Sequence, residues 1–597
     1  MIFAGFTLFL VFLSAVPLFG AVCLGRRPER LFAAGLLANG LVFYLFCAVN
    51  LCGFGFYLIF AADLALYIPV ALKLRKDPGA FRKFPTPAVA VLYAALTAGF
   101  LLARREFPLY WDEFSHWASS AKFLFEHGKL NCEFPRLLGH ASYPPGLAVL
   151  DTLVHKCFIG MGFCDFMPRF AVRALKICIF ILPFGDTPRR ASFRECAAGM
   201  LILWLAASLL FPDGNFTCES DCVLGIVFAA AVYVVMRHDR SAYDDLFLAL
   251  LLGWLFLIKK AGTGFAVMVQ LLYLVRWIAD RRSGTKPRRP VWSALVVLAA
   301  PFLLQMSWSL LLKVHRTPIK FPVGDISPAR IARLVRYGEP DYWRQVAARF
   351  ARGLLRELPF VLAVAGALAW LRKKTEDRPR RLGDLRWFLP LAFAVYLASL
   401  FLTYLFIFND YQALHLVSFR RYVHGFLIMP LGAALMLVFS GGLTVRLRRI
   451  LTSYTVLALL TLGVGWLYIQ EHARAYRLNK EWIGDRAVLE ARYGKLLRAP
   501  GARFVAVSGA GNGVYHPILK YEYEDRFVDE TALNGPERKM SAAELREFVR
   551  QARYVLIVRP PKELPPELAA LWRSPPELRR DFTLFEVAPE GYLRPVR

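Results

Sequence analysis

Apolar runs of about twenty residues, separated by short polar segments, make up most of the chain before residue 470. An α-helix of that length spans the hydrocarbon core of a bilayer. About fourteen such runs can be marked, and they lie near residues 2–24, 31–50, 53–74, 87–103, 165–185, 196–212, 221–237, 244–259, 261–279, 291–313, 358–372, 386–408, 421–440 and 450–470. The pattern predicts an α-helical polytopic membrane protein of about fourteen transmembrane helices.

Lysine and arginine gather in every second connection between these runs. Basic loops are retained in the cytoplasm, so the alternation places the N-terminus, the long or acidic segments and the C-terminal tail outside. Met1 to Leu24 lacks a charged leading region and a small-residue cleavage site, so we interpret it as a retained span of a plasma (inner) membrane protein. The basic connections are Arg26 to Arg30, Lys73 to Lys83, Arg189 to Arg194, Arg276 to Arg289, Arg372 to Arg386 and Arg446 to Arg449.

The same alternation explains the formal net charge of +29 in 597 residues. Because the basic residues fall in short clusters between apolar runs rather than on one face, we expect no nucleic-acid partner. The ten cysteines show no repeated spacing and predict neither a zinc site nor a disulfide framework. Cys132 and Cys218 would both lie outside, where a bridge is possible, but two unpaired thiols are the simpler expectation.

The connection from Leu147 to Met161 decides the topology of everything after it. It is apolar but only about fifteen residues long, so we expect a helix that lies in or dips into the outer interface. If it crossed the membrane instead, Arg189 to Arg194 would lie outside and every later segment would be inverted.

The long connection from Lys313 to Pro359 contains a predicted amphipathic helix. Ser327-Pro328 is a good helix start. Apolar residues then recur at three- and four-residue steps, accompanied by arginines: Trp343, Val346, Phe350 and Leu354, with Arg344, Arg349, Arg352 and Arg356. Such a helix lies on the membrane surface, where it could serve as an anchor, as a phosphate-binding element, or as both.

The apolar runs stop after about residue 470, and the remaining tail predicts a small α/β domain. Strands are expected at Arg503 to Val507, Tyr554 to Val558 and Phe582 to Val587, and Ser541 with Glu544 forms a capping box that opens a helix to about Gln551. Gly509 to Gly513 lacks the full GxGxxG spacing, so an ordinary strand-to-helix turn is expected there.

These patterns divide the chain into four parts. We expect N-terminal transmembrane helices at 1–103, an external catalytic loop with interfacial helices at 104–164, a transmembrane core with an external loop 314–358 at 165–470, and an extracytoplasmic α/β domain at 471–597.

Asp112 and Glu113 are adjacent carboxylates in the first large external loop. Their mutual repulsion and the flanking Trp111, Phe114 and Trp117 would raise one pKa, as a general base at the membrane surface requires. An alternative is that Asp112 is the N-cap of a helix from Glu113 to Phe125. Both interpretations stay open.

His116 follows these carboxylates on the same face of that predicted helix. Asp112, Glu113 and His116 could therefore bind a divalent metal, with Asp221 as a further candidate ligand. A hydrogen-bonding histidine at the interface is the simpler alternative.

Acidic residues also begin a predicted span at Glu219 and Asp221. Carboxylates in the first turn of a helix are stabilised by its dipole, which needs no further function. Asp221 would nevertheless face the Asp112 loop if the spans surround one cavity, and we expect it to act as a second acid or as a metal ligand.

Basic residues stand at the outer ends of other predicted spans. Lys260, followed by Gly262 and Gly264, could contact a phosphate, because glycine permits close backbone approach, or it could only reach toward the interface. Arg420 and Arg421, before Tyr422, oppose the positive-inside trend. Phosphate binding or simple headgroup contact would explain them.

Several of these motifs together resemble the GT-C superfamily of polytopic glycosyltransferases, especially the bacterial branch related to protein mannosyltransferases and lipid A aminoarabinose transferases. The resemblance covers roughly residues 104 to 430 and rests on Asp112-Glu113 with Gly128, Tyr143-Pro144-Pro145-Gly146, Asp221, Lys260 and Arg421-Tyr422. It implies that Asp112 is catalytic and that the donor is a sugar on a polyprenyl phosphate. The first three spans exceed the usual family core, and no role is assigned to them.

The expected reaction is an inverting transfer of a monosaccharide to a hydroxyl of a lipid, glycan or protein acceptor on the extracytoplasmic face. Asp112 would be the general base, and Glu113 and Asp221 would assist it. Substrate contacts are expected from His116, Tyr143, Lys260, Arg420, Arg421 and Tyr422. Two other classes stay open: an O-antigen-type polymerase or ligase with a diphosphate-linked donor, and a lipid or solute transporter, which would carry ionisable residues in mid-span.

Overall fold

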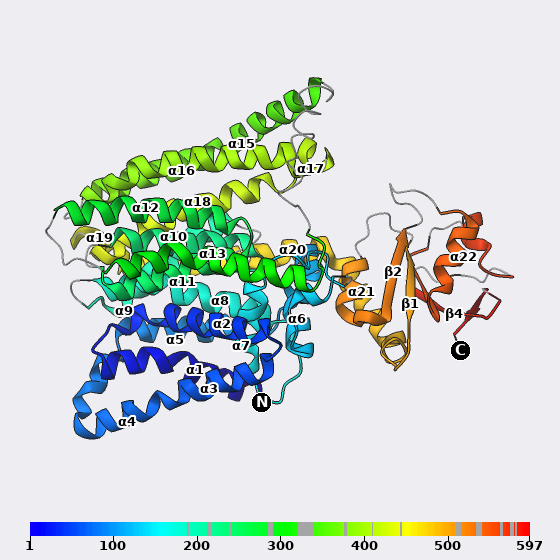
Figure 1. Ribbon diagram of the computed structural model, residues 1–597, viewed down its shortest axis with the longest axis horizontal. Coiled ribbons are helices and arrows are strands. Elements are labelled where there is room, and N and C mark those ends of the chain that lie inside the picture. Colours follow the sequence, from blue (N-terminus) through cyan, green and yellow to red (C-terminus); the bar gives the residue numbers. More distant parts are fainter. Residues whose placement is uncertain are drawn as a thin grey trace. The chain divides into compact units, whose positions relative to one another are not determined.

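The chain forms two compact units (Figure 1). In this computed structural model the described residues are 1–135, 137–187, 190–211, 216–237, 240–283, 290–319, 340–374, 379–408, 410–441, 445–508, 515–532, 540–560, 565–573, 578, 582–590 and 592–596. The membrane unit comprises Met1–Phe107, Ser120–Glu133 and Ser142–Glu471. The C-terminal unit comprises Pro108–Ser119, Phe134–Ala141 and His472–Arg597, so parts of the expected loop domain at 104–164 belong to each unit.

Helices that run side by side build the described part of the membrane unit (Figure 1). In order they are α1 (Ile2–Cys23), η1 (Pro28–Arg30), α2 (Phe32–Ala48), α3 (Cys52–Ala65), α4 (Tyr67–Lys76), η2 (Pro78–Lys83), α5 (Pro87–Ala103), α6 (Ala118–His127), η4 (Asn131–Glu133), α7 (Gly146–Lys156), α8 (Met167–Phe180), η5 (Leu182–Asp186), α9 (Phe193–Leu210), α10 (Ser220–Met236), α11 (Ala242–Ile258), α12 (Gly262–Ser283), α13 (Val291–Val314), α15 (Pro340–Lys374), α16 (Pro379–Phe406), α17 (Asp410–His415), α18 (Phe419–Gly441), α19 (Val445–Leu451) and α20 (Tyr454–Leu497), the last of which continues into the C-terminal unit.

Within the described residues, ten helical stretches are long and apolar enough to cross a membrane, and α5 and α10 are shorter apolar helices. The chain is therefore a multi-pass membrane protein. The two remaining predicted spans, 165–185 and 244–259, overlap α8 and α11.

The surface helix and the span predicted on either side of Pro359 form one continuous helix, α15. Val346 and Phe350 are buried, and Arg349 donates to the carbonyl of Leu414. The prediction of a separate interfacial helix was therefore wrong. Proline lacks an N–H and often interrupts a helix, but α15 continues through Pro359. Ser327-Pro328 lies outside the described residues.

One end of the membrane helices, here called the Asp186 end, is joined by ion pairs. Asp186 in η5 lies 2.6 Å from Arg237 Nε and also pairs with Arg30. Glu29, beside Arg30, accepts a hydrogen bond from Thr86 at the start of α5. Basic connections that were predicted to share one side therefore do meet at one end of the unit.

These contacts also define the path of α7. Helix α5 begins at the Asp186 end and α8 finishes there, so the chain between them makes no net crossing. With 11 residues, α7 is too short to span a bilayer. The structure thus agrees with the expected non-crossing helix at Leu147 to Met161.

The described C-terminal unit is built around a five-stranded sheet of order β2-β1-β3-β4-β5. Strand β1 pairs in parallel with both β2 and β3, and β4 pairs antiparallel with both β3 and β5. Val505, Ile557 and Phe548 contribute to its core. The three predicted strands and the Ser541–Glu544 capping box are present, whereas Gly509 to Gly513 lies outside the described residues. The elements after α20 are β1 (Phe504–Ser508), α21 (Tyr515–Tyr523), η7 (Glu524–Arg526), β2 (Phe527–Ala532), α22 (Ala542–Arg550), β3 (Tyr554–Val558), α23 (Pro566–Ala569), β4 (Phe582–Val587) and β5 (Leu593–Pro595).

All ten cysteines are free thiols. Cys132 and Cys218 are both buried and form no disulfide with each other. Of the two expectations, a bridge or two thiols, the structure has the two thiols.

Candidate functional site

Asp221 joins two basic side chains where three helices of the membrane unit meet. Its Oδ1 accepts a hydrogen bond from Lys259 Nζ at 2.6 Å, and its Oδ2 lies 3.0 Å from Arg421 Nε. Arg421 Nη1 is also 3.6 Å from Glu219 Oε2. We call Glu219, Asp221, Lys259 and Arg421 the Asp221 cluster; it combines the first turns of α10 and α18 with the residue after α11.

Two glycines bring α10 and α18 close enough for these contacts. A Cβ on Gly225 would lie 2.5 Å from the carbonyl oxygen of Gly425, so the backbones touch at this crossing. Asp221 and Arg421 each stand four residues earlier, one turn from the crossing. The helix packing therefore fixes the distance between the acid and the guanidinium.

A third glycine shapes the turn that carries Lys259. A Cβ on Gly262 would lie 1.8 Å from the carbonyl oxygen of Leu255, so a larger residue would displace α12 from the end of α11. Gly264 has open space around the corresponding position. Gly262 therefore packs on the end of α11, whereas Gly264 makes no such contact; the expected approach of a phosphate to these glycines stays a prediction.

Tyr143 lies within electrostatic range of Lys259. Its backbone carbonyl accepts a hydrogen bond from Asn131 Nδ2 at 2.7 Å, and the carbonyl of the preceding Ser142 accepts one from Trp308 Nε1 at 3.2 Å. A Cβ on Gly146 would lie 2.5 Å from the carbonyl oxygen of Leu257, so the Tyr143 to Gly146 turn packs directly on the end of α11.

The other predicted basic residues have different neighbours. Lys260 is half-buried, and burial lowers the pKa of its amine, but Lys259 is the lysine that reaches Asp221. Arg420 is more than half exposed and lies 3.9 Å from Glu357 Oε2. The Tyr422 ring lies 5.2 Å from Lys259 Nζ, within cation–π range.

The Asp221 cluster holds two cations beside two carboxylates. Asp221 is 7% exposed, and its carboxylate fixes the positions of Lys259 Nζ and Arg421 Nε. Fixed cations in a poorly solvated site stabilise negative charge that develops on a substrate. The same two cations oppose a metal ion at Asp221, so the cluster does not favour Asp221 as a metal ligand.

Asp112, Glu113 and His116 belong to the C-terminal unit. Asp112 has helical backbone angles, φ −63° and ψ −30°, and its side chain makes no cap hydrogen bond. Asp112 thus occupies the N-cap position of the turn Glu113–Trp117, but its side chain does not cap it. The Oε2 of Glu113 accepts hydrogen bonds from the backbone N–H groups of Leu109, at 2.7 Å, and Tyr110, at 3.2 Å, which precede the turn.

These three residues differ in their access to solvent. Glu113 and His116 are buried, whereas Asp112 is half-buried. The His116 ring packs edge-on against Trp117 and lies 5.9 Å from the His140 ring. Glu113 to Trp117 form a π-helical turn, a distortion found often at functional sites.

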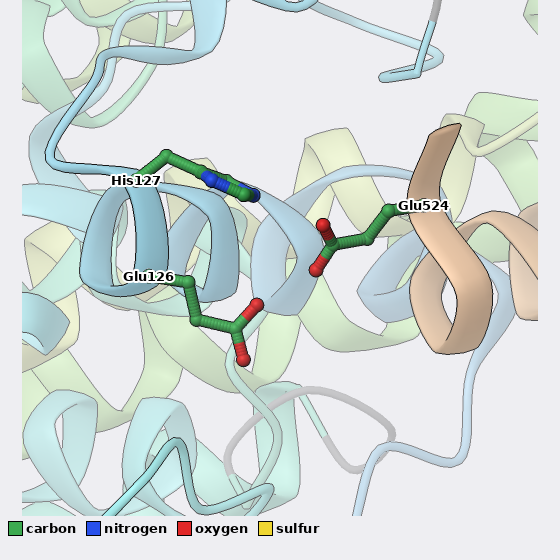
Figure 2. A group of neighbouring side chains, drawn as sticks. All are labelled: Glu126, His127 and Glu524. Atoms are coloured by element: carbon green, nitrogen blue, oxygen red, sulfur yellow. The ribbon is translucent and has the colours of Figure 1, made fainter. Parts of the chain in front are cut away.

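Figure 2 shows other side chains of metal-ligating type, Glu126 and His127 at the end of α6 and Glu524 in η7. The first two belong to the membrane unit and the third to the C-terminal unit. We assign no metal site to them.

Helix α8 carries a row of buried cations that was not predicted from the sequence. Arg169, Arg173 and Lys176 share one face and are at most 2% exposed. Arg173 Nη2 donates to both oxygens of Glu106, at 2.8 and 2.6 Å, and Tyr468 donates to Glu106 Oε1 at 2.7 Å. Their spacing within an apolar run was visible in the sequence, since ionisable residues inside a span usually mark a function.

A second buried pair lies between α15 and α18. His424 Nε2 is 2.7 Å from Glu357 Oε2, and His424 Nδ1 contacts the carbonyl of Leu210. Both partners are acceptors, so the pair requires a proton on both ring nitrogens or on Glu357.

Comparison with known proteins adds no relative. No protein-family model matches the chain, and no curated protein matches its sequence.

Proposed function

We propose that this membrane protein is an inverting glycosyltransferase, which moves a monosaccharide from a polyprenyl phosphate to a hydroxyl of a cell-envelope acceptor on the extracytoplasmic face. The Asp221 cluster carries the proposal, because a departing phosphate needs fixed positive charge, which Lys259 and Arg421 supply. The motif resemblance to GT-C enzymes supplies the reaction class. A motif analogy does not establish function by itself, so the reaction must be assayed directly.

The resemblance to GT-C enzymes, and not a distance to the Asp221 cluster, assigns the role of general base to Asp112. In this proposal, Asp112 takes the proton of the acceptor hydroxyl while the hydroxyl oxygen attacks the anomeric carbon, and the bond from that carbon to the phosphate oxygen breaks with its electron pair remaining on the phosphate. Glu113 has a positioning role, because its hydrogen bonds to Leu109 and Tyr110 hold the segment that carries Asp112. Lys259 and Arg421 stabilise the leaving phosphate.

The test is transfer by the purified full-length protein, incubated with labelled polyprenyl-phosphate sugars and cell-envelope extract. Asp112→Asn should reduce transfer by about 10²- to 10⁴-fold, the usual contribution of a general base, and should leave the thermal unfolding temperature unchanged. Full transfer by a folded Asp112→Asn protein would remove the base assignment. Transfer from a diphosphate-linked donor alone would favour the polymerase or ligase class.

Lys259 and Lys260 provide a matched pair for the phosphate assignment. Lys259→Met should reduce transfer and also lower the unfolding temperature, because Asp221 keeps only one of its two cationic partners. Lys260→Met removes the same charge one residue later and should change both measurements little. Equal losses in the two variants would contradict a specific role for Lys259.

A transporter is the second candidate, and the buried cations of α8 favour it. Arg173 and Lys176 lie inside a predicted span, where ionisable residues often line a substrate path. Movement of a polyprenyl-linked sugar across proteoliposomes, without glycosyl transfer, would support this function. Loss of that movement in Lys176→Met, with Lys260→Met as control, would connect it to α8.

A further inference from the structure

A cavity of about 220 Å³ opens beside the β4–β5 hairpin of the C-terminal unit. It is lined by Trp572 and Arg573 from the segment after α23 and by Glu590, Tyr592, Leu593, Arg594 and Pro595 from the hairpin. The proposed transfer reaction uses none of these residues.

The cavity is held open by the packing of the unit. Leu593 N donates to the carbonyl of Leu571 at 2.9 Å, and Ala588 N donates to the carbonyl of Tyr592 at 2.8 Å, so the hairpin is fixed to the segment after α23. Leu571, Trp572 and Leu593 also belong to the hydrophobic core of the unit. Binding would therefore require little rearrangement.

The charged residues that line the cavity are two arginines and one glutamate. Arg573 lies over the Tyr592 ring at 5.3 Å, and Arg546, which donates to the carbonyl of Ala570, lies 5.7 Å from the same ring. Arg594 Nη2 lies 3.1 Å from Glu590 Oε2. Two guanidinium groups, those of Arg573 and Arg594, thus line the cavity with one carboxylate, and guanidinium forks match the oxygens of carboxylate and phosphate groups.

Trp572 and Glu590 are further hydrogen-bonding groups of the lining. Trp572 is 6% exposed, and its Nε1 is buried with no hydrogen-bond partner among the described residues. A buried donor of this kind gains free energy from a ligand oxygen. Glu590 can accept hydrogen bonds from hydroxyl groups.

We propose that this cavity binds a sugar that carries a negative charge, either the carboxylate of a sugar acid or the phosphate of a sugar phosphate. The arginines take the anionic group, Glu590 takes sugar hydroxyls, and Trp572 Nε1 donates to a ligand oxygen. This binding site does not depend on the proposed transfer reaction, since it needs no lipid donor and no base.

The test is calorimetric titration of the full-length protein in nanodiscs with four probes: galacturonate, glucose 1-phosphate, glucose and inorganic phosphate. One or both anionic sugars should bind, and the tighter of the two identifies the source of the charge. Glucose and inorganic phosphate should bind roughly tenfold or more weakly, because each lacks one set of contacts. Binding of phosphate as tight as that of the sugar phosphate, equal binding of glucose, or no binding of either anionic sugar would overturn the proposal.

Variants separate this cavity from general surface charge. Arg573→Ala and Arg594→Ala, both at exposed side chains, should each weaken binding roughly tenfold or more. Trp572→Phe keeps the ring in the core and should weaken binding by a smaller factor. Arg553 is the matched control, since it pairs with Glu586 at the same 3.1 Å as Arg594 with Glu590; equal weakening by Arg553→Ala would contradict the site. Asp112→Asn should bind as the wild type does, which keeps this result separate from the transfer assay.

Discussion

Glu530, in strand β2, has a carboxyl pKa higher than that of an exposed glutamate. Burial raises the pKa of its carboxyl from 4.5 to about 7, and the Ser508 hydroxyl offsets part of the rise. The folded unit therefore binds this proton more tightly than the unfolded chain does. The stability that the proton contributes is complete below about pH 4.5 and is lost as the pH rises through about 7.

Glu530→Gln should remove this pH dependence. At pH 8 the variant should be more stable than the wild type by up to about 3 kcal/mol, and the difference should shrink toward pH 5. Hydrogen exchange of peptides from β1 and β2 measures this in the full chain, because comparing the two proteins at one pH cancels the intrinsic exchange rates. Asp529→Asn, at the exposed neighbouring carboxylate, is the control. A gain of equal size at both pH values would contradict the raised pKa.

The sequence predicted which charged residues belong to the site, but not which of them contact one another. The sequence indicated that acids and bases stand at the ends of spans, and Asp221, Arg421 and Tyr422 do lie together with Lys259. It could not separate Lys259 from Lys260, because their contacts depend on where α11 ends. The rotation of a helix end is set by packing, here by Gly262 on Leu255, and not by the local pattern.

The same limit applies to Asp112 and Glu113. Both are acidic neighbours in sequence, yet Glu113 is fully buried against two backbone N–H groups while Asp112 stays half-buried. The π-helical turn that begins at Glu113 has no simple sequence signature.

At the scale of elements, Gly262 and Gly264 at the start of α12 should respond differently to replacement by alanine. Gly262→Ala should lower the unfolding temperature, because its Cβ would meet the Leu255 carbonyl at 1.8 Å and the turn would have to move. Gly264→Ala places the same methyl group in open space within α12. It should be neutral or stabilising by about 0.5–1 kcal/mol.

Thermal unfolding of the two purified variants, followed by circular dichroism, tests this. Glycosyl transfer, once detected, should fall with Gly262→Ala, since Lys259 sits in the same turn. Equal unfolding temperatures for the two variants would show that the turn tolerates a Cβ at position 262.

Elements with a strong periodic or capping pattern were predicted, and weaker ones were missed. The spans, three strands and the capped helix α22 follow directly from apolar runs and from Ser541 with Glu544. Strand β2 reads Phe-Val-Asp-Glu-Thr-Ala, with too little apolar alternation for a prediction, and β5 has 3 residues. Helix α15 was predicted in two parts because only the residues from about 358 onward form an apolar run.

At the scale of the whole molecule, the alternation of basic connections predicted which helix ends lie together, although these segments are far apart in sequence. Arg30, Asp186 and Arg237 meet at one end of the membrane unit, and Asp221, Lys259 and Arg421 lie at three other helix ends. Sequence could not show how the loop at 104–164 divides between two units, because that depends on contacts with residues more than 300 positions later, such as Phe114 with Tyr521 at 5.3 Å between ring centres.

The topology itself makes the last prediction. Because α7 does not cross, the turn after it and the end of α4 should lie on opposite sides of the membrane, and positive-inside charge places the turn outside. Gly162→Cys and Lys76→Cys, both at exposed positions, are suitable reporters once the partly exposed native Cys23 and Cys164 are replaced by serine. A membrane-impermeant maleimide added to intact cells should label position 162, and should label position 76 only after permeabilisation. Labelling of both from one side would mean that α7 crosses, whereas the reverse pattern would place the Asp221 cluster on the cytoplasmic side and exclude transfer on the extracytoplasmic face.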